Sequence, residues 1–180
     1  MPLLKANVLV TGLPGCGKST LVNRLVEKAR AKGIIVGGIS TPEFRLSTGR
    51  RGGFLIQDIA TGEKQIMASV DRSSPVSVGR YGVNLQAIQE VGVKAINSAI
   101  TEADLVVIDE IGKMELAVSE FKTSVAGALN STKPVLGTIG MRLKTAFVAE
   151  IKNRSDVTLF VLTPETRSQV YQNVVNLIGL

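Results

Sequence analysis

Gly12-Leu-Pro-Gly-Cys-Gly-Lys-Ser19 identifies the fold class of this chain. The stretch fits the pattern G-x-x-x-x-G-K-[ST] and lies between an aliphatic run at 6–11 and a segment of helical periodicity at 18–32. Consecutive backbone N–H groups can surround a triphosphate only where no Cβ atom interferes, which explains the three glycines. The following helix presents its positive N-terminal end to the same phosphates. The stretch therefore predicts a strand, a phosphate-binding loop (Walker A) and a helix, in that order.

Individual residues of this loop have distinct predicted roles. We expect Lys18 to reach the β- and γ-phosphates, the hydroxyl of Ser19 to ligate Mg²⁺, and Thr20 to support the α-phosphate. Cys16 occupies a position that tolerates many side chains, so a small filler residue is favoured over a redox gate on nucleotide binding. The expected nucleotide-binding residues are Gly12, Leu13, Pro14, Gly15, Cys16, Gly17, Lys18, Ser19 and Thr20.

The rest of the chain alternates between aliphatic runs and segments of helical periodicity. Strands are predicted at 6–11, 34–39, 105–109, 135–139 and 157–162, and helices at 18–32, 84–101, 114–129, 143–153 and 165–178. Asn84 is a candidate cap of the second helix. The segment 163–167 is interpreted equally well as packing against the base or as capping the last helix through Thr163. Alternation of this kind predicts an α/β fold with three layers, in which helices cover both faces of a mostly parallel sheet.

A segment at about 40–84 departs from this alternation. Gly, Ser, Pro and Arg are frequent there, and residues 53–59 and 63–68 resemble the two strands of a β-hairpin joined at 60–62. We interpret the segment as an insertion beside the nucleotide site. With 180 residues, the chain is expected to form a single domain, 1–180, that contains this inserted hairpin.

Two carboxylates follow the strand predicted at 105–109. Asp109 is the expected metal ligand, through a bound water, and Glu110 points the other way and is the expected base that orients and deprotonates the attacking water. Asp109-Glu-Ile-Gly112 also satisfies the D-x-x-G pattern of switch GTPases. Guanine specificity is not supported, because Asn153-Arg-Ser-Asp156 has Arg in place of Lys and precedes a strand.

Composition excludes several other chemistries. The chain has no His, which excludes His-ligated zinc and Ser-His or Cys-His nucleophiles, and its single Cys excludes an intrachain disulfide and indicates a cytoplasmic setting. No run is long and apolar enough to predict a membrane span. The net charge of +6 supports a nucleic-acid partner only weakly, since the basic residues are scattered and no aromatic residues interleave with them.

The run Asp109-Glu-Ile-Gly-Lys-Met-Glu-Leu116 strongly resembles the THEP-type nucleoside-triphosphatases, a family that includes the cancer-related nucleoside-triphosphatase. The segments 33–39, 51–54, 78–84, 152–154 and 163–167 extend the resemblance over nearly the whole chain. It implies a RecA-like P-loop core, Mg²⁺-dependent hydrolysis of ATP, GTP, CTP and UTP to the diphosphate and phosphate, and Glu110 as the base. One departure follows the strand at 135–139, where many members carry His and Arg and this chain has Gly140 and Met141. The chain is then expected to be slower, or to use Arg142 or Lys144.

Phosphoryl transfer needs further positive charge around the γ-phosphate. Lys113 and Arg154 are the favoured candidates, so the predicted catalytic set is Lys18, Glu110, Lys113 and Arg154, with Ser19 and Asp109 as metal ligands. Arg80 is a further candidate, and Arg45 and Arg51 rank slightly lower than the favoured pair. Thr138 is interpreted equally well as a γ-phosphate sensor or as a simple strand-end hydroxyl.

Two alternatives to hydrolysis remain open. In a nucleotide or nucleoside kinase, the insertion would bind a phosphate acceptor. Glu110 counts against this, because water activation would waste the donor, although an acceptor hydroxyl could use the same base. In an RNA-associated switch protein, slow hydrolysis would time an interaction. An acceptor-dependent burst of ADP would favour the kinase, and stimulation by RNA would favour the switch.

Overall fold

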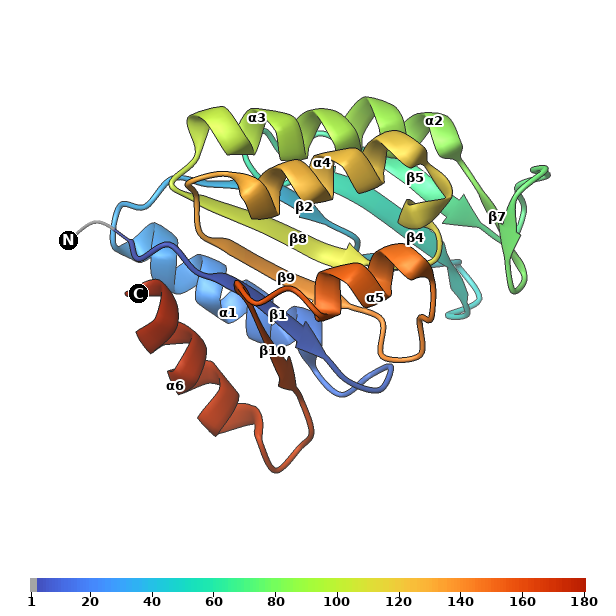
Figure 1. Ribbon diagram of the computed structural model, residues 1–180. Coiled ribbons are helices and arrows are strands. Elements are labelled where there is room, and N and C mark those ends of the chain that lie inside the picture. The colour runs from blue at the N-terminus through green and yellow to red at the C-terminus, as the bar shows by residue number, and fades with distance from the viewer. Residues whose placement is uncertain (1–2) are drawn as a thin grey trace.

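A ten-stranded sheet forms the centre of the computed structural model, which describes residues 3–180 (Figure 1). Along the sheet the strands follow the order β10-β1-β9-β8-β2-β4-β5-β7-β6, and β3 pairs with β4. The strands are β1 Asn7–Thr11, β2 Val36–Ser40, β3 Glu43–Arg45, β4 Arg51–Asp58, β5 Lys64–Ser69, β6 Ser77–Val78, β7 Tyr81–Val83, β8 Leu105–Ile111, β9 Val135–Ile139 and β10 Val157–Val161.

The five strands predicted from the aliphatic runs pair in parallel. In this half of the sheet, β1 lies between β10 and β9, and β8 lies between β9 and β2. The side chains of β1, β2, β8 and β9 are almost all buried, as expected for parallel strands that helices cover, whereas those of β10, at the edge of the sheet, are partly exposed. Because the strands are parallel, the carboxyl ends of β1, β8 and β9 meet at one edge of the sheet.

Helices cover both faces of the sheet, which confirms the predicted α/β fold (Figure 1). On one face, α1 and α6 pack on aliphatic residues such as Val8, Val10 and Val107. On the other face, α3, α4 and α5 pack on residues such as Leu9, Val106 and Ile108. The helices are α1 Lys18–Ala31, α2 Leu85–Ala87, α3 Lys94–Glu102, α4 Ser119–Asn130, α5 Ala146–Lys152 and α6 Arg167–Ile178, with the π-helix η1 Ile88–Val93 and the 3-10 helix η2 Glu115–Ala117. None of the helices among residues 3–180 has the length and apolar character that a membrane crossing requires.

The segment predicted as an insertion extends this same sheet. β4 pairs with β2 in the antiparallel direction, β4 and β5 form an antiparallel pair, and β7 and β6 follow beyond β5. α2, η1 and α3 then return over this part of the sheet, with the side chain of Asn84 accepting a hydrogen bond from the backbone N–H of Ala87. Gly92 allows η1 to lie close to β4, because a Cβ there would be 2.6 Å from Cδ1 of Ile56.

Two predicted helices differ in their bounds. The helix predicted at 114–129 is interrupted, because Val118 is extended (φ −101, ψ 121) between η2 and α4. That break keeps Val118 in the core while Glu115 faces the carboxyl edge of β8. The helix predicted at 143–153 begins at Ala146, where the side chain of Thr145 accepts a hydrogen bond from the N–H of Val148.

Candidate functional site

The loop between β1 and α1 has the backbone geometry that a phosphate site needs. Gly15 and Gly17 have positive φ values of 78 and 103, so a Cβ at either position would be strained. Gly12 is required for a different reason, since a Cβ there would lie 2.6 Å from the carbonyl oxygen of Leu162. The loop therefore curves against the end of β10 and directs the N-terminus of α1 toward the carboxyl edge of the sheet.

Lys18 lies across this loop. Its ammonium donates to the carbonyl oxygens of Gly12 at 3.2 Å and Leu13 at 3.4 Å. Both carbonyl groups belong to the loop in which the phosphates would bind, so the positive charge of Lys18 lies beside the expected phosphate site. An ammonium in that position is suited to neutralise phosphate oxygens.

Asp109, near the end of β8, is 3% exposed. Burial raises the pKa of its carboxyl, while hydrogen bonds from Thr138 and Ser19 and the charge of Lys18 lower that pKa. Thr138 on β9 donates to Oδ1 of Asp109 at 2.6 Å and is itself buried. The hydroxyl of Thr138 therefore orients the carboxylate of Asp109. Asp109 and Ser19, the two expected metal ligands, are brought together although they are 90 positions apart in the sequence.

Two further acidic residues, Glu110 and Glu115, lie beside Asp109. Burial raises the pKa of Glu110, the charge of Lys18 lowers it, and the charge of Asp109 raises it further. A carboxylate with a raised pKa is a better proton acceptor near neutral pH. Gly112 leaves room for both groups, because a Cβ there would lie 2.6 Å from Oε2 of Glu115 and 3.2 Å from Oε1 of Glu110.

Glu115 was not singled out by the sequence analysis, and the structure buries it completely within the site. Burial is the main cause that raises its pKa to about 8, with the charges of Glu110 and Asp109 adding to the rise and backbone N–H groups opposing it. Its carboxyl therefore carries a proton at neutral pH. The position of Glu115 within the Asp-Glu-Ile-Gly-Lys-Met-Glu-Leu run was the available signal, but burial of a Glu is not readable from sequence.

We expect Glu115→Gln to remove a pH dependence of stability. The unfolded chain releases this proton near the ordinary pKa of 4.5 and the folded protein near 8, so the free energy of unfolding falls as pH rises between these values. The neutral amide has no such proton, and the free energy of unfolding of the variant should exceed that of the parent by on the order of 4 kcal/mol at pH 8. Urea denaturation from pH 5 to pH 9 measures this. Glu120→Gln, at an exposed position, is the control, and equal pH slopes for the two variants would contradict the assignment.

One cavity of about 740 Å³ connects these groups. Nine of the residues predicted to bind nucleotide or to act in catalysis line it: seven from the loop and α1, one from the end of β8 and one that follows β8. They are Gly12, Pro14, Gly15, Gly17, Lys18, Ser19, Thr20, Glu110 and Lys113. Leu13, which is 52% exposed, and Cys16, which packs against the core under α1, are not among the lining residues.

The loop after β9 also lines the cavity. Gly140, Met141 and Arg142 all contribute to it, and Met141 is 45% exposed. Of the two cations considered as replacements for the missing His and Arg, Arg142 therefore faces the site, whereas Lys144 is not among its lining residues. Arg51 lines the far side of the cavity and pairs with Glu43 at 2.6 Å, and Arg45 pairs with the same Glu43 at 3.0 Å.

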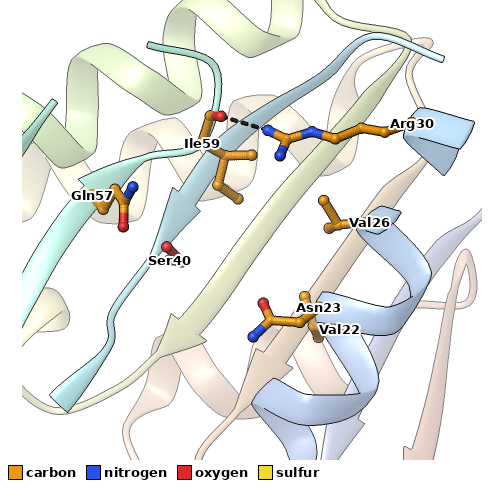
Figure 2. Close-up of a pocket in the computed structure, with 7 residues that line it drawn as sticks. All are labelled: Val22, Asn23, Val26, Arg30, Ser40, Gln57 and Ile59. Atoms are coloured by element: carbon orange, nitrogen blue, oxygen red, sulfur yellow. Dashed lines mark hydrogen bonds between the residues drawn. The ribbon is translucent and has the colours of Figure 1, made fainter. Parts of the chain in front are cut away.

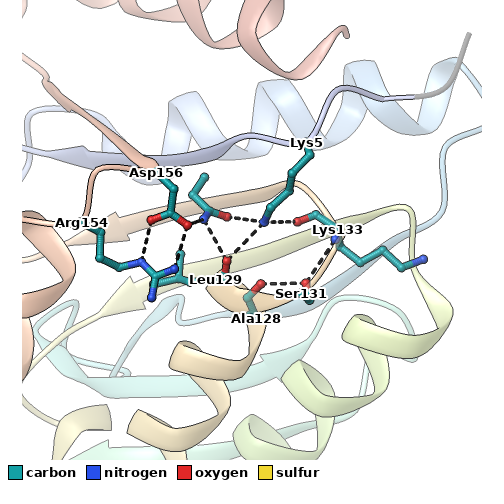
Figure 3. Close-up of polar contacts among 8 residues, drawn as sticks. Lys5, Ala128, Leu129, Ser131, Lys133, Arg154 and Asp156 are labelled. Atoms are coloured by element: carbon teal, nitrogen blue, oxygen red, sulfur yellow. Dashed lines mark hydrogen bonds and ion pairs between the residues drawn. The ribbon is translucent and has the colours of Figure 1, made fainter.

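The catalytic role predicted for Arg154 is wrong. Arg154 precedes β10, whose first residue pairs with Asn7, and the phosphate loop follows Thr11 at the other end of β1. Five strand residues separate the two ends by roughly 15 Å. At that distant edge Arg154 donates to both carboxylate oxygens of Asp156, at 2.8 and 2.7 Å (Figure 3). Its role there is structural.

Arg154→Ala should lower stability and leave hydrolysis unchanged. The substitution removes both hydrogen bonds to a partly exposed carboxylate, which costs about 1 kcal/mol in the free energy of unfolding. Asp156 keeps its hydrogen bond from Asn7 at 3.0 Å, which limits the loss. Chemical denaturation and phosphate release measured on one preparation test both parts. A fall in hydrolysis with unchanged stability would restore the catalytic interpretation.

Arg167, at the start of α6, is a second residue that the sequence analysis did not place in the site. Its Nε donates to the carbonyl oxygen of Cys16 at 3.0 Å, and its guanidinium lies beside Gly17. Arg167 therefore supports the phosphate loop from the β10 side. The signal in the sequence was the segment 163–167, for which packing against the base or helix capping were considered. The hydroxyl of Thr163 accepts from the N–H of Thr166, in the turn before α6.

A smaller cavity of about 140 Å³ lies between α1 and the strands β2 and β4 (Figure 2). It is lined by Val22, Asn23, Val26, Arg30, Ser40, Gln57 and Ile59. Arg30 spans it and donates to the carbonyl oxygen of Ile59 at 2.7 Å. None of the predicted phosphate or catalytic residues contributes to it, so the larger cavity is the candidate site.

Comparison with known proteins agrees with this geometry. A family model described as NTPase matches residues 7–175. Nucleoside-triphosphatase THEP1 of Methanothermobacter thermautotrophicus is 44% identical over 96% of this chain and 95% of its own length, and that of Thermotoga sp. is 40% identical over 95% and 94%. The crystal structure of THEP1 from Aquifex aeolicus has a TM-score of 0.86 and 34% identity, covering 97% of this chain and 99% of that chain. The solution structure of a human cancer-related nucleoside triphosphatase has a TM-score of 0.79 and 33% identity, covering 95% and 96%.

Proposed function

Since the chain belongs to the NTPase family and is a nucleoside-triphosphatase, we propose that it hydrolyses ATP, GTP, CTP and UTP alike, with Mg²⁺ as its cofactor. The observation that carries the proposal is the meeting of Lys18, Ser19, Asp109 and Glu110 at the carboxyl ends of β1 and β8. A cytoplasmic setting is part of the proposal and rests on the single Cys.

The residues present fit a magnesium ion. Mg²⁺ prefers hard oxygen ligands and keeps several waters, and here a buried carboxylate with a raised pKa lies beside a hydroxyl at the N-terminus of α1. Ser19 would ligate the ion directly and Asp109 through water, with Thr138 orienting Asp109. When bound, the ion supplies neutralisation of the charge on the β- and γ-phosphate oxygens.

The protein groups then have separate tasks. The loop amides and Lys18 hold the phosphates, and Lys18 stabilises negative charge as the bond to the γ-phosphate breaks. Glu110 orients the attacking water and accepts its proton, which its raised pKa favours. Lys113 and Arg142, both on the cavity wall, add positive charge near the γ-phosphate. Phosphoryl transfer needs little more from the protein than positioning and charge.

Broad base tolerance follows from where the recognition groups lie. The loop contacts phosphates through backbone N–H groups, which carry no information about the base. The only sequence candidate for reading guanine, Asn153-Arg-Ser-Asp156, lies at the opposite edge of the sheet, where Arg154 pairs with Asp156. We therefore assign the specificity of this site to the triphosphate.

The test is phosphate release by the purified protein from ATP, GTP, CTP and UTP, with Mg²⁺ or with EDTA and no added acceptor. We expect release from all four with Mg²⁺ and only background release with EDTA, because the ion offsets phosphate charge that Lys18 alone does not balance. Release that persists in EDTA would refute the metal requirement, and release from one nucleotide alone would refute broad specificity. Added RNA should leave the rates unchanged.

A further inference from the structure

The main cavity extends well beyond the part that a triphosphate needs. Residues of the phosphate loop line one side of it, and Phe54, Met67, Val78 and Met114 line another. We name these four residues the apolar compartment. Phe54, Met67 and Val78 come from β4, β5 and β6, which follow β2 in the sheet order, whereas the phosphate loop follows β1. Glu110, on β8 between β9 and β2, separates the two sides.

The chemistry of the reaction decides which molecule can enter the apolar compartment. In phosphoryl transfer, the attacking oxygen and the leaving oxygen lie on opposite sides of the γ-phosphorus. If Glu110 accepts the proton of the attacking group, that group lies on the Glu110 side, and the diphosphate with its nucleoside extends the other way. The apolar compartment is therefore on the side of the attacking group.

Water does not require such a compartment. Small-molecule sites are typically lined by apolar and aromatic side chains with a few polar groups. Here the ring of Phe54 is half-buried and held edge-on by Tyr81, with 5.3 Å between the ring centroids, so it offers a fixed surface for a planar ring. Met67 is buried and completes the floor.

The charges nearby disfavour an anionic occupant. Arg51, the cation nearest to Phe54 at 5.7 Å from its ring, pairs with Glu43 at 2.6 Å. Glu110 and Glu115 contribute two further carboxyl groups to the wall. A phosphorylated acceptor would face the carboxylate of Glu110, with the charge of Arg51 already neutralised by Glu43, whereas a neutral alcohol would meet no such repulsion.

We propose that this protein also transfers the γ-phosphoryl group to a hydroxyl of a small neutral alcohol that carries a planar ring, the chemical class of nucleosides. The hydroxyl oxygen bonds to the γ-phosphorus, the bond from that phosphorus to the β–γ bridging oxygen breaks, and the hydroxyl proton passes to Glu110. The products are a phosphate monoester and the nucleoside diphosphate. This inference rests on the proposed roles of Lys18 and Glu110 in hydrolysis.

The experiment incubates the protein with γ-labelled ATP, Mg²⁺ and millimolar thymidine, adenosine or thymidine monophosphate, and separates inorganic phosphate from labelled ester. We expect labelled monoester from at least one nucleoside and none from the monophosphate. Inorganic phosphate as the sole product from both nucleosides would overturn the transfer and leave the hydrolase intact. No release of any kind would instead count against the proposed function.

Two variants connect the transfer to the apolar compartment. Phe54→Ala should lower the ratio of labelled ester to inorganic phosphate about tenfold, the loss expected for one stacking ring. Ile66→Ala removes an exposed apolar side chain of β5 beside Met67 and should leave that ratio unchanged. The same ratio in both variants would show that the ring alcohol does not use Phe54, and would refute the proposed site.

Discussion

Lys18→Ala should lower the rate of phosphate release by about 10²–10³-fold, the loss typical when one preorganised electrostatic contact to the transition state is removed. The ammonium of Lys18 is held by two carbonyl oxygens of the loop, at 3.2 and 3.4 Å, so it is positioned before nucleotide arrives. The charge that develops as the γ-phosphoryl group is transferred would then lack its nearest protein cation. Initial rates of phosphate release at saturating ATP and Mg²⁺ measure the effect.

Lys32→Ala is the matched control for this variant. Lys32 lies at the other end of α1, is exposed, and carries the same charge without contact to the loop. The control should hydrolyse ATP at the parental rate. If Lys18→Ala kept more than half of that rate, or if both variants lost activity equally, the phosphate role of Lys18 would have to be abandoned.

Glu110→Gln should retain nucleotide binding and lower hydrolysis by about 10²–10³-fold, within the range for loss of a positioned general base. The amide keeps the shape of the side chain but cannot accept the proton of the attacking water. Titration calorimetry measures the binding of ATP, and phosphate release is measured in a separate experiment. Hydrolysis at the parental rate in a correctly folded variant would contradict this assignment.

The pH dependence of the parent protein gives a second check on Glu110. Because burial raises its pKa, the rate should fall as pH decreases through that raised value, where the base becomes protonated. This acidic limb should be absent from the residual activity of Glu110→Gln and present in Glu120→Gln, which alters an exposed carboxylate on α4. The same limb in all three proteins would assign it to another group.

Local pattern was sufficient for the parallel half of the sheet and for the phosphate loop. Aliphatic runs of five or six residues between helical segments are typical of parallel strands, and β1, β2, β8, β9 and β10 lie where those runs predicted, β10 as the edge strand. The helix predicted at 114–129 was interrupted at Val118, because packing in the core outweighs helical periodicity there. Helix propensity alone does not reveal this competition between core packing and helical periodicity.

Thr138 and Arg154 show the same limit of prediction from the sequence. Thr138 lies near the end of one predicted strand and Arg154 precedes another, and a role at the γ-phosphate was available for both. Strand direction places Thr138 beside Asp109 at the carboxyl edge, with 2.6 Å between the hydrogen-bonded oxygens, and Arg154 beside Asp156 at the opposite edge. Distance along the sequence does not distinguish these outcomes.

Residues adjacent in the chain were enough to predict the α/β class, the phosphate loop and the two carboxylates at the end of β8, because glycines permit the loop conformation and an aliphatic strand ends in charge. The burial and protonation of Glu115, the support of the loop by Arg167, and the cavity that Phe54 and Met67 share with Lys18 required the folded chain. These properties arise from burial and from contacts between distant segments. They therefore depend on how the sheet is ordered and covered, which no local stretch of residues encodes.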